Sequence, residues 1–315
     1  MNPIVSWIED ANTICVFRHQ NPDADALGSQ FGLVSWLKHR YPKKSIFAMG
    51  FHRGTSPDLF GSYESVSDDV VRTSLAIILD TANASRIDDD RYQLALKRIK
   101  IDHHPYVETY ADFEWIDEHA ASTSELVTEL IHSVQSEALP KSIARTLYMG
   151  IISDTLRFST RSTRSKTLEQ ASYLVQSHLD LAEINDDLFA LDEAEFALTS
   201  YIRSHAVFEP SGLAYIVLHQ EDLKRLNVTQ GKAKEKVSEL GLMRSVKIWA
   251  LFIEQDDSQK GLYNGSLRSR HQTINDIAKM HRGGGHKLAA AVKECTLDEI
   301  QQVLSECRTR LKETL

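Results

Sequence analysis

Short apolar runs alternate with helix-patterned segments through the first half of the chain, and this order constrains the fold more than any other feature. Between the first two runs, apolar residues such as Leu27, Phe31 and Val34 recur at helical spacing. A β-α-β order predicts a parallel sheet covered by helices. The expected strands are Ile14–Phe17, Ser45–Met49, Leu75–Leu79, Arg98–Ile101 and Phe113–Ile116.

The pattern changes after Pro210 and Gly212, which interrupt a helical segment near the middle of the chain. At 315 residues the chain also exceeds the usual size of a single core. We therefore expect an α/β protein with a parallel-sheet domain over residues 1–186, a helical linker over 187–210 and a smaller α/β domain over 211–315. We expect the active-site cleft to lie between the two domains. The strands expected in the second domain are Leu213–Leu218, Val246–Ile253 and Leu262–Arg268, and its helices are Thr273–Met280 and Leu297–Leu311.

The charge is unevenly distributed along the chain. Residues 1–210 hold 19 Lys and Arg against 31 Asp and Glu, whereas residues 211–315 hold 17 against 13. An acidic body suits bound cations, and a basic second domain suits an anionic ligand. The acidic total, a net charge of −8, argues against binding along duplex nucleic acid, which requires an extended basic face.

Targeting signals are not evident in the sequence. No run approaches the 18 apolar residues of a membrane span, and the N-terminus lacks a basic region followed by an apolar one. The three cysteines, Cys15, Cys295 and Cys307, have no paired spacing and are expected to be buried thiols. These features favour a cytoplasmic protein that does not enter a membrane.

Acids and histidines follow the expected strands or lie in a helix start at four places. The carboxyl ends of parallel strands converge on one edge of a sheet, so these side chains are expected to meet there. Any one of them would more often be a helix cap or a turn former, but four such places together favour a divalent metal site. Imidazole and carboxylate without thiolate suit Mn²⁺ or Mg²⁺, and so many ligands suit two ions that share one carboxylate. The residues are His19, Asp23, Asp25, Asp80, Asp102, His103, His104 and Asp154.

A second group of candidates lies in the basic half of the chain. Arg268 and Arg270 alternate along an expected strand, so both are predicted to face one side and to bind phosphate bidentately. The glycines of the run Gly283-Gly284-Gly285-His286 permit close backbone approach to an anion. The alternatives are a solvated sheet edge for the arginines and a flexible loop for the glycines.

These motifs together resemble the DHH phosphoesterases, which are named for a motif identical to Asp102-His103-His104. "HQNPDADALGSQ" from His19, "LD" ending at Asp80 and "GIISDT" around Asp154 are similar to that superfamily's other motifs, and "ASTSELV" from Ala121 resembles a further common segment. "GSLRSR" and "GGGHKLAAA" resemble the DHHA1 domain. The size of the chain is similar to that of the stand-alone oligoribonuclease and pAp phosphatase type, called nanoRNase.

The resemblance implies a ligand set and further roles. One Mn²⁺ would be held by His19, Asp23 and Asp80, and a second by Asp25, Asp80, His103 and Asp154, with Mg²⁺ or Co²⁺ as possible substitutes. His104, Asp80 and Asp102 would be catalytic: His104 would orient a phosphate or a neighbouring ligand, Asp80 would bridge the ions, and Asp102 would fix an imidazole tautomer. Arg268, Arg270, Gly283, Gly284, Gly285 and His286 would bind the substrate.

The implied substrates are very short 5′-phosphorylated oligoribonucleotides such as pApA, cleaved to mononucleotides, and pAp, dephosphorylated to AMP. The alternatives are a cyclic-di-AMP phosphodiesterase, an inorganic pyrophosphatase or polyphosphatase, and a non-catalytic nucleotide sensor. A homodimer is plausible from the family.

Three positions depart from the family pattern. Arg282 and Leu156 stand where the family commonly has glycine, and Ala291 replaces the glycine that closes the last motif. Arg282 is expected either to contact phosphate or to cap a helix. Outside the motifs, the acidic run at Asp88 is expected to be a solvated turn, and His52 is expected to lack an acidic partner.

Overall fold

The computed structural model describes residues 2–52 and 59–313 of the chain. The chain divides into two compact units, Met1–Ala190 and Leu191–Leu315. The division falls within the segment 187–210 that we expected to be a helical linker. Helix α8 (Glu193–His205) lies in this segment, and its Leu198 and Ile202 are buried in the core of the second unit.

The first unit contains a five-stranded sheet in the order β2-β1-β3-β4-β5, and every neighbouring pair of strands is parallel. This confirms the parallel sheet predicted from the β-α-β pattern. All five strands overlap the apolar runs that predicted them. They are β1 (Thr13–Phe17), β2 (Ser45–Ala48), β3 (Leu75–Leu79), β4 (Lys97–Asp102) and β5 (Phe113–Ile116).

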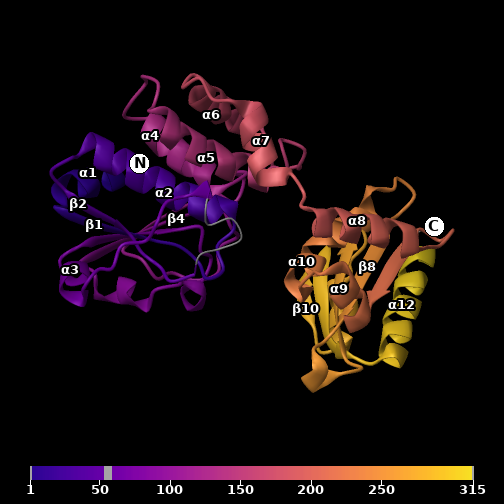
Figure 1. The fold of residues 1–315 in the computed structure, drawn as a ribbon. Helices are drawn as coiled ribbons and strands as arrows, with labels where there is room; N and C mark the ends of the chain where they lie inside the picture. The colour runs from indigo at the N-terminus through magenta and orange to yellow at the C-terminus, as the bar shows by residue number, and fades with distance from the viewer. Residues whose placement is uncertain (1, 53–58, 314–315) are drawn as a thin grey trace. The chain divides into compact units, whose positions relative to one another are not determined.

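Helices cover both faces of this sheet (Figure 1). One face carries the main core, in which α1, α2, α4 and α5 pack on the strands, and α6 and α7 pack on that helical layer. A smaller core covers the other face, under α3 and a 3₁₀ turn. The helices are α1 (Asn2–Asp10), α2 (Ala24–Arg40), α3 (Asp68–Arg72), α4 (Thr123–His132), α5 (Lys141–Asp154), α6 (Ser165–Val175) and α7 (Leu181–Phe189), and the 3₁₀ turns are η2 (Ala84–Arg86) and η3 (Asp90–Leu94).

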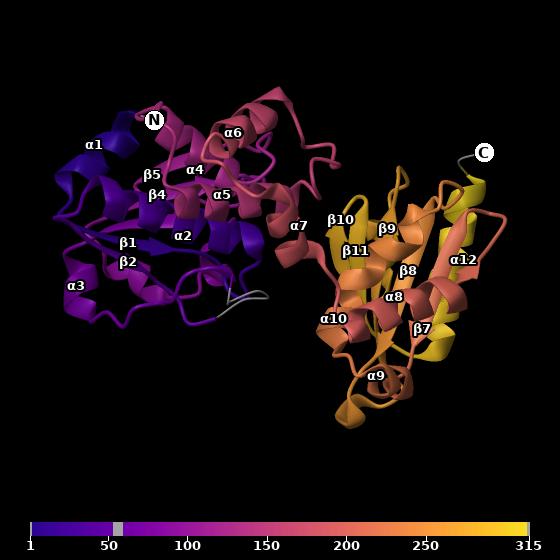
Figure 2. The same cartoon turned by 45° about the horizontal axis from the view of Figure 1, so that its top comes forward.

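The second unit contains a mixed six-stranded sheet in the order β10-β11-β9-β8-β7-β6, in which only β7 and β8 are parallel among the described strands (Figure 2). It confirms a second α/β region in the C-terminal part of the chain. The strands are β6 (Val207–Phe208), β7 (Leu213–Leu218), β8 (Ile248–Glu254), β9 (Tyr263–Ser269), β10 (Gly284–His286) and β11 (Ala289–Cys295).

Each face of the second sheet has its own apolar core. Helices α11 and α12 pack on one face, and α8, α9, α10 and a 3₁₀ turn pack on the other. The cysteines Cys295 and Cys307 are buried in the first of these cores, and Cys15 is buried in the first unit, as predicted. The remaining elements are α9 (Gln220–Leu226), α10 (Gln230–Glu235), α11 (Asn275–Met280), α12 (Leu297–Lys312), η4 (Lys236–Leu242) and η5 (Asp257–Gln259).

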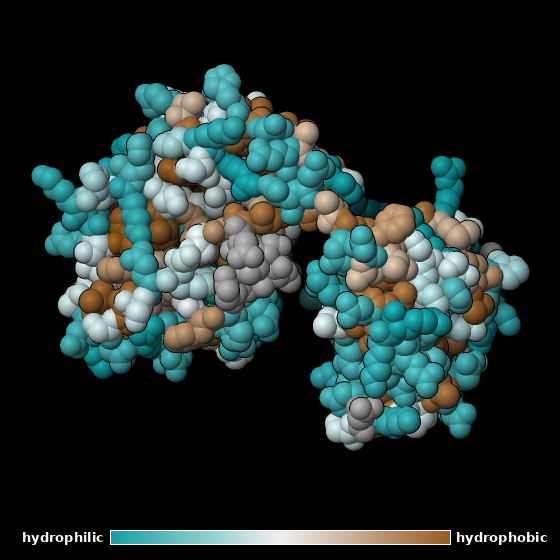
Figure 3. Space-filling model, in the orientation of Figure 1, coloured by the Kyte–Doolittle hydropathy of each residue, from teal (hydrophilic) through white to brown (hydrophobic). Residues whose placement is uncertain are grey.

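Hydrophilic residues cover most of the surface visible in Figure 3. Within residues 2–52 and 59–313, no helix combines the length and the apolar character needed to cross a membrane. 

Candidate active site

The carboxyl edge of the parallel sheet brings together the acids and histidines of the first unit. His19 follows β1, Asp80 follows β3, and His103 follows β4. Two helices complete the group, since α2 carries Asp25 in its first turn and α5 ends on Asp154. The chain therefore assembles at one place residues that are separated by as many as 135 positions in the sequence.

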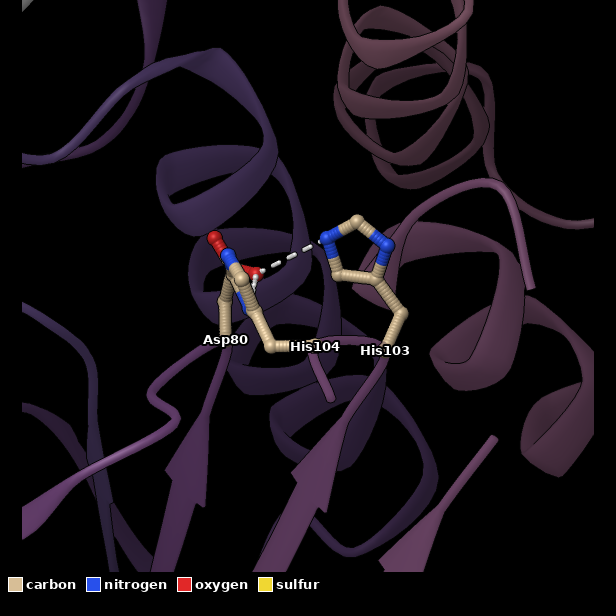
Figure 4. Close-up of side chains that lie close together, drawn as sticks. All are labelled: Asp80, His103 and His104. Carbon is tan, nitrogen blue, oxygen red and sulfur yellow. Dashed lines mark ion pairs between the residues drawn. The ribbon is translucent and has the colours of Figure 1, made fainter. Parts of the chain in front are cut away.

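Asp80 lies at the centre of this group, and Figure 4 shows its carboxylate between His103 and His104. Its Oδ2 atom is 3.3 Å from Nε2 of His19, and its Oδ1 atom is 3.5 Å from both Nε2 of His103 and Nδ1 of His104. The hydroxyl of Thr123 donates a hydrogen bond of 3.1 Å to the same Oδ1. Asp80 is buried, so its charge depends on these partners.

The N-terminus of α4 holds Asp25. Both carboxylate oxygens of Asp25 accept backbone N–H bonds, from Thr123 at 2.7 Å and Ser124 at 2.9 Å. The helix begins here because Ser122 Oγ accepts the N–H of Glu125. A helix N-terminus attracts negative charge, which makes the buried position of Asp25 tolerable.

The tautomers of two histidines suit metal binding. Nδ1 of His19 is 2.8 Å from the carbonyl of Gln20, and Nδ1 of His103 is 3.4 Å from the carbonyl of Ala120. A carbonyl only accepts hydrogen bonds, so each Nδ1 carries a proton, and Nε2 is the ring nitrogen that would bind a cation after losing its own proton. Both Nε2 atoms face carboxylates, and Nε2 of His103 is 3.5 Å from Oδ2 of Asp154.

The donor atoms fit divalent cations. Ligand atoms within 4.8 Å of one another form three groups among the described residues. Two donors that each lie about 2.1 Å from one ion are roughly 3.0–3.4 Å apart, close to the separations around Asp80. The six residues expected as ligands all lie in these groups, together with His104. The groups are His19, Asp23 and Asp80; Asp25, His103 and Asp154; and Asp80, His103 and His104.

The pKa values of the carboxylates differ because their surroundings differ. Burial alone would raise the pKa of Asp80, but hydrogen bonds from His103 and His19 hold it well below its ordinary value. Burial, with the charges of neighbouring carboxylates, raises the pKa of Asp25 to about 7 and that of Asp154 to about 9. Without a cation, Asp25 and Asp154 therefore hold protons more tightly than ordinary carboxylates do. A bound metal ion would supply the positive charge in place of these protons.

His104 differs from the other two histidines. Its Nδ1 is 2.8 Å from Oδ1 of Asp102, and the same oxygen accepts the backbone N–H of His104 at 3.1 Å. The Asp102 carboxylate therefore fixes Nδ1–H, which leaves Nε2 as the ring atom directed away from this pair.

The candidate substrate-binding residues of the second unit differ in whether they are available to a ligand or engaged within the protein. The strand register places Arg268 and His286 on either side of Ala289, so both lie on one face of the sheet. Arg268 donates to the carbonyls of Leu267 and Ala290, and burial lowers its pKa. No carboxylate pairs with Arg268 among the described residues, which leaves its charge available to an anion.

Arg270 is engaged within the protein. It lies beyond the end of β9, and its guanidinium donates to the carbonyls of Gly241, Met243 and Val246 at 2.5–3.0 Å. These bonds hold the loop that precedes β8. Arg268 pairs with Trp249, which packs against the core on the η4 side of the sheet, so both arginines lie on that side, but the guanidinium of Arg270 is occupied by these carbonyls.

The three glycines also differ from one another. A Cβ on Gly283 would lie 1.9 Å from the carbonyl oxygen of Ala291, and Gly285 has a φ of +135°. The backbone therefore requires glycine at both of these positions. Gly284 lies in the edge strand β10, and a Cβ there would meet no atom within 4 Å.

Several residues near the site were missed or misread from the sequence. Asp88, expected in a solvated turn, is instead buried against the guanidinium of Arg18, and His52 contacts the same carboxylate. Arg18 also donates to the carbonyl of His19 at 3.0 Å, so this pair supports a proposed ligand. Arg18 could have been recognised from the sequence as a charged residue that directly follows an apolar strand. Lys100, inside the run before Asp102, carried a similar signal.

The fold and the site define a metal-dependent phosphoesterase with two α/β units. The sequence matches the DHH family, N-terminal domain, over residues 13–151 and the DHHA1 domain over residues 212–313. The chain belongs to the DHH phosphoesterase family and is a hydrolase.

Relatives of known name match nearly the whole chain. A "Probable bifunctional oligoribonuclease and PAP phosphatase NrnA" from Streptococcus mutans is 37% identical, with 98% of each chain covered. The "Bifunctional oligoribonuclease and PAP phosphatase NrnA" of Bacillus subtilis is 34% identical, again with 98% of each covered. Among solved structures, an exopolyphosphatase-related protein from Bacteroides fragilis has a TM-score of 0.85 and 25% identity, with 99% of this chain and 97% of that chain covered.

Proposed function

We propose that this protein hydrolyses very short 5′-phosphorylated oligoribonucleotides, such as pApA, to mononucleotides, and pAp to AMP, with two Mn²⁺ ions. The observation that carries the proposal is the set of donors centred on Asp80, which faces three imidazoles at 3.3–3.5 Å. The names of the two bacterial relatives, which include oligoribonuclease and PAP phosphatase, support the choice of substrates.

The ligands divide between two positions that share Asp80. His19 and Asp23 would complete one position, and Asp25, His103 and Asp154 the other. Two divalent ions held there would lower the pKa of water and offset the charge that develops on the phosphoryl oxygens. Mg²⁺ or Co²⁺ could occupy the same oxygen and nitrogen donors.

His104 is proposed to act directly on the substrate. Because Asp102 holds Nδ1–H, only Nε2 can exchange a proton with a phosphate oxygen or with the departing ribose oxygen. Asp102 would also stabilise the imidazolium form of His104 after it takes up a proton. The two residues would thus hold the proton that the alcohol requires when it leaves.

The second unit is proposed to bind the terminal phosphate of the nucleotide. Arg268 and His286 share one sheet face, and Gly284 leaves backbone accessible beside them. Arg270, Gly283 and Gly285 would then shape this surface rather than contact the phosphate. A substrate held by its end in this way would be short, and we propose that the protein acts on such substrates in the cytoplasm.

The test is Mn²⁺-dependent turnover of pApA, pAp, a 24-nucleotide RNA, cyclic-di-AMP and pyrophosphate. Wild type is compared with Asp80→Asn, and with Asp69→Asn as a control for loss of an exposed acid on α3. We expect AMP from pApA and pAp, lost in Asp80→Asn and retained in Asp69→Asn. Hydrolysis of pyrophosphate or cyclic-di-AMP alone would replace the proposed substrates, and binding of nucleotide without turnover would indicate a sensor.

A further inference from the structure

Lys100 is a fully buried cation beneath the proposed metal site. It lies in β4, two residues before Asp102, and its relative exposure is 0%. Its Nζ donates to the carbonyl of Ala82 at 2.9 Å, is 3.6 Å from Oδ2 of Asp102, and lies 4.7 Å from the ring centre of Tyr110. A buried ammonium group is costly unless it is paired, so its position requires an explanation.

One end of this contact network holds the turn that follows β3. Asp80 has a φ of +54°, a left-handed conformation that is unfavourable for a residue with a Cβ. The next two carbonyls are each held by a side chain from elsewhere: the hydroxyl of Tyr110 donates to Thr81, and Nζ of Lys100 donates to Ala82. These bonds fix the backbone that carries Asp80.

The other end of the network reaches the acid and histidine motif. Oδ2 of Asp102 is buried and has no hydrogen-bond partner, and Nζ of Lys100 is the cation that faces it. Oδ1 of Asp102 orients His104 through two hydrogen bonds. Lys100 thus touches both the turn after β3 and the turn after β4.

We propose that Lys100 is a positioning residue that fixes these two turns relative to each other, so that Asp80 and His103 converge on the metal ions and His104 lies beside them. The inference rests on the metal site of the proposed function. Lys100 itself touches neither substrate nor metal; it acts through the carbonyl of Ala82 and the carboxylate of Asp102.

The direction in which Mn²⁺ affinity changes when Lys100 loses its charge distinguishes a positioning role from that of a simple counter-charge. Removal of a positive charge near a cation site strengthens cation binding by Coulomb's law. Loss of positioning weakens binding, because the ligands no longer converge. Lys100→Met keeps much of the side-chain length and apolar volume but lacks the charge and the donor.

The experiment is a titration of the metal-free protein with Mn²⁺, in which free ion is measured by electron paramagnetic resonance. Outer residues that orient metal ligands typically change affinity by about 10–100-fold, so Lys100→Met is expected to weaken Mn²⁺ binding at least tenfold. Tyr110→Phe removes one hydroxyl without a change of charge, and is expected to weaken binding in the same direction. It also provides a test if Lys100→Met does not fold.

A matched control is Lys44→Met. Lys44 also donates to backbone carbonyls, in this case those of Glu9 and Ala11, but at the N-terminal side of the sheet. Its loss is expected to leave Mn²⁺ affinity unchanged. Equal or tighter Mn²⁺ binding in both site variants would overturn the positioning role while leaving the proposed function intact. Failure of wild type to bind Mn²⁺ would overturn both.

Discussion

Gly28 of α2 faces Gly150 of α5 so closely that a Cβ on Gly28 would lie 3.0 Å from the Cα of Gly150. The two helices also carry two proposed ligands, because Asp25 lies one turn before Gly28 and Asp154 lies one turn after Gly150. The close contact of the two glycines therefore determines how closely the carboxylates of Asp25 and Asp154 can approach each other. Helix packing and the metal site are linked through this contact.

Gly150→Ala is expected to damage both stability and metal binding. The added Cβ would lie 2.0 Å from Oγ of Ser124 and 3.0 Å from Oδ1 of Asp25, so α4 or α5 must move. Overpacking of this kind costs about 1–3 kcal/mol, which urea unfolding would measure. Gly231→Ala is the control, since its Cβ would meet its nearest atom at 3.8 Å. Unchanged stability and Mn²⁺ affinity in Gly150→Ala would contradict the link.

His104→Asn is expected to lower kcat by about 10²–10⁴-fold, as for loss of a proton-transfer group. Mn²⁺ binding should change little, because His19, Asp25 and the other proposed ligands remain. A large loss of Mn²⁺ affinity would instead identify His104 as a metal ligand.

Gly284→Ala and Gly283→Ala are expected to have different effects. The first has space for a Cβ, so the protein should remain stable while KM for pAp rises about tenfold or more through a hindered contact with phosphate. The second places a Cβ 1.9 Å from Ala291 and should lower the melting temperature. An unchanged KM in a folded Gly284→Ala would remove Gly284 from the proposed phosphate site.

The metal-free protein is expected to lose stability as the pH rises. Burial raises the folded-state pKa of Asp25 to about 7 and of Asp154 to about 9, so the folded state holds these protons more tightly than the unfolded chain does. The associated stability is complete below the ordinary Asp pKa and is lost as the pH rises through 7 and 9. Melting temperatures in EDTA should therefore fall between pH 6 and 9.

Saturating Mn²⁺ should reverse this trend, since ionised carboxylates bind the cation. Asp154→Asn should reduce the pH dependence seen in EDTA. A melting temperature in EDTA that is constant or increases over this range would show that these carboxylates ionise normally.

Leu156→Gly is expected to stabilise the protein by about 0.5–1 kcal/mol. Leu156 has a φ of +45° and is 56% exposed, so it bears left-handed strain with little packing in return. Arg282, another residue at a family glycine position, also has positive φ, but its guanidinium binds Glu299 and the carbonyl of Glu294. Arg282→Gly should therefore not stabilise in the same way, and chemical denaturation would compare the two variants.

Local pattern was sufficient for much of the fold. The strands of the parallel sheet are four to six residues long and overlap the short runs that predicted them, and the capping residue Ser122 begins α4. Helix α1 was not among the expected elements, although Ile4 and Ile8, which are buried in the core, have helical spacing. The order of acids and histidines along the chain similarly indicated which side chains meet at the sheet edge.

The sequence by itself determined the periodic elements and the chemical types at the strand ends, because both depend on neighbours a few residues apart. Only the tertiary structure decided the partners of individual polar groups. Arg18 meets Asp88 across 70 positions, and Asp25 meets Thr123 across 98. Likewise, Arg270 binds carbonyls more than twenty positions earlier in the chain. Such pairs form only when the folded chain excludes water and brings distant donors to buried acceptors.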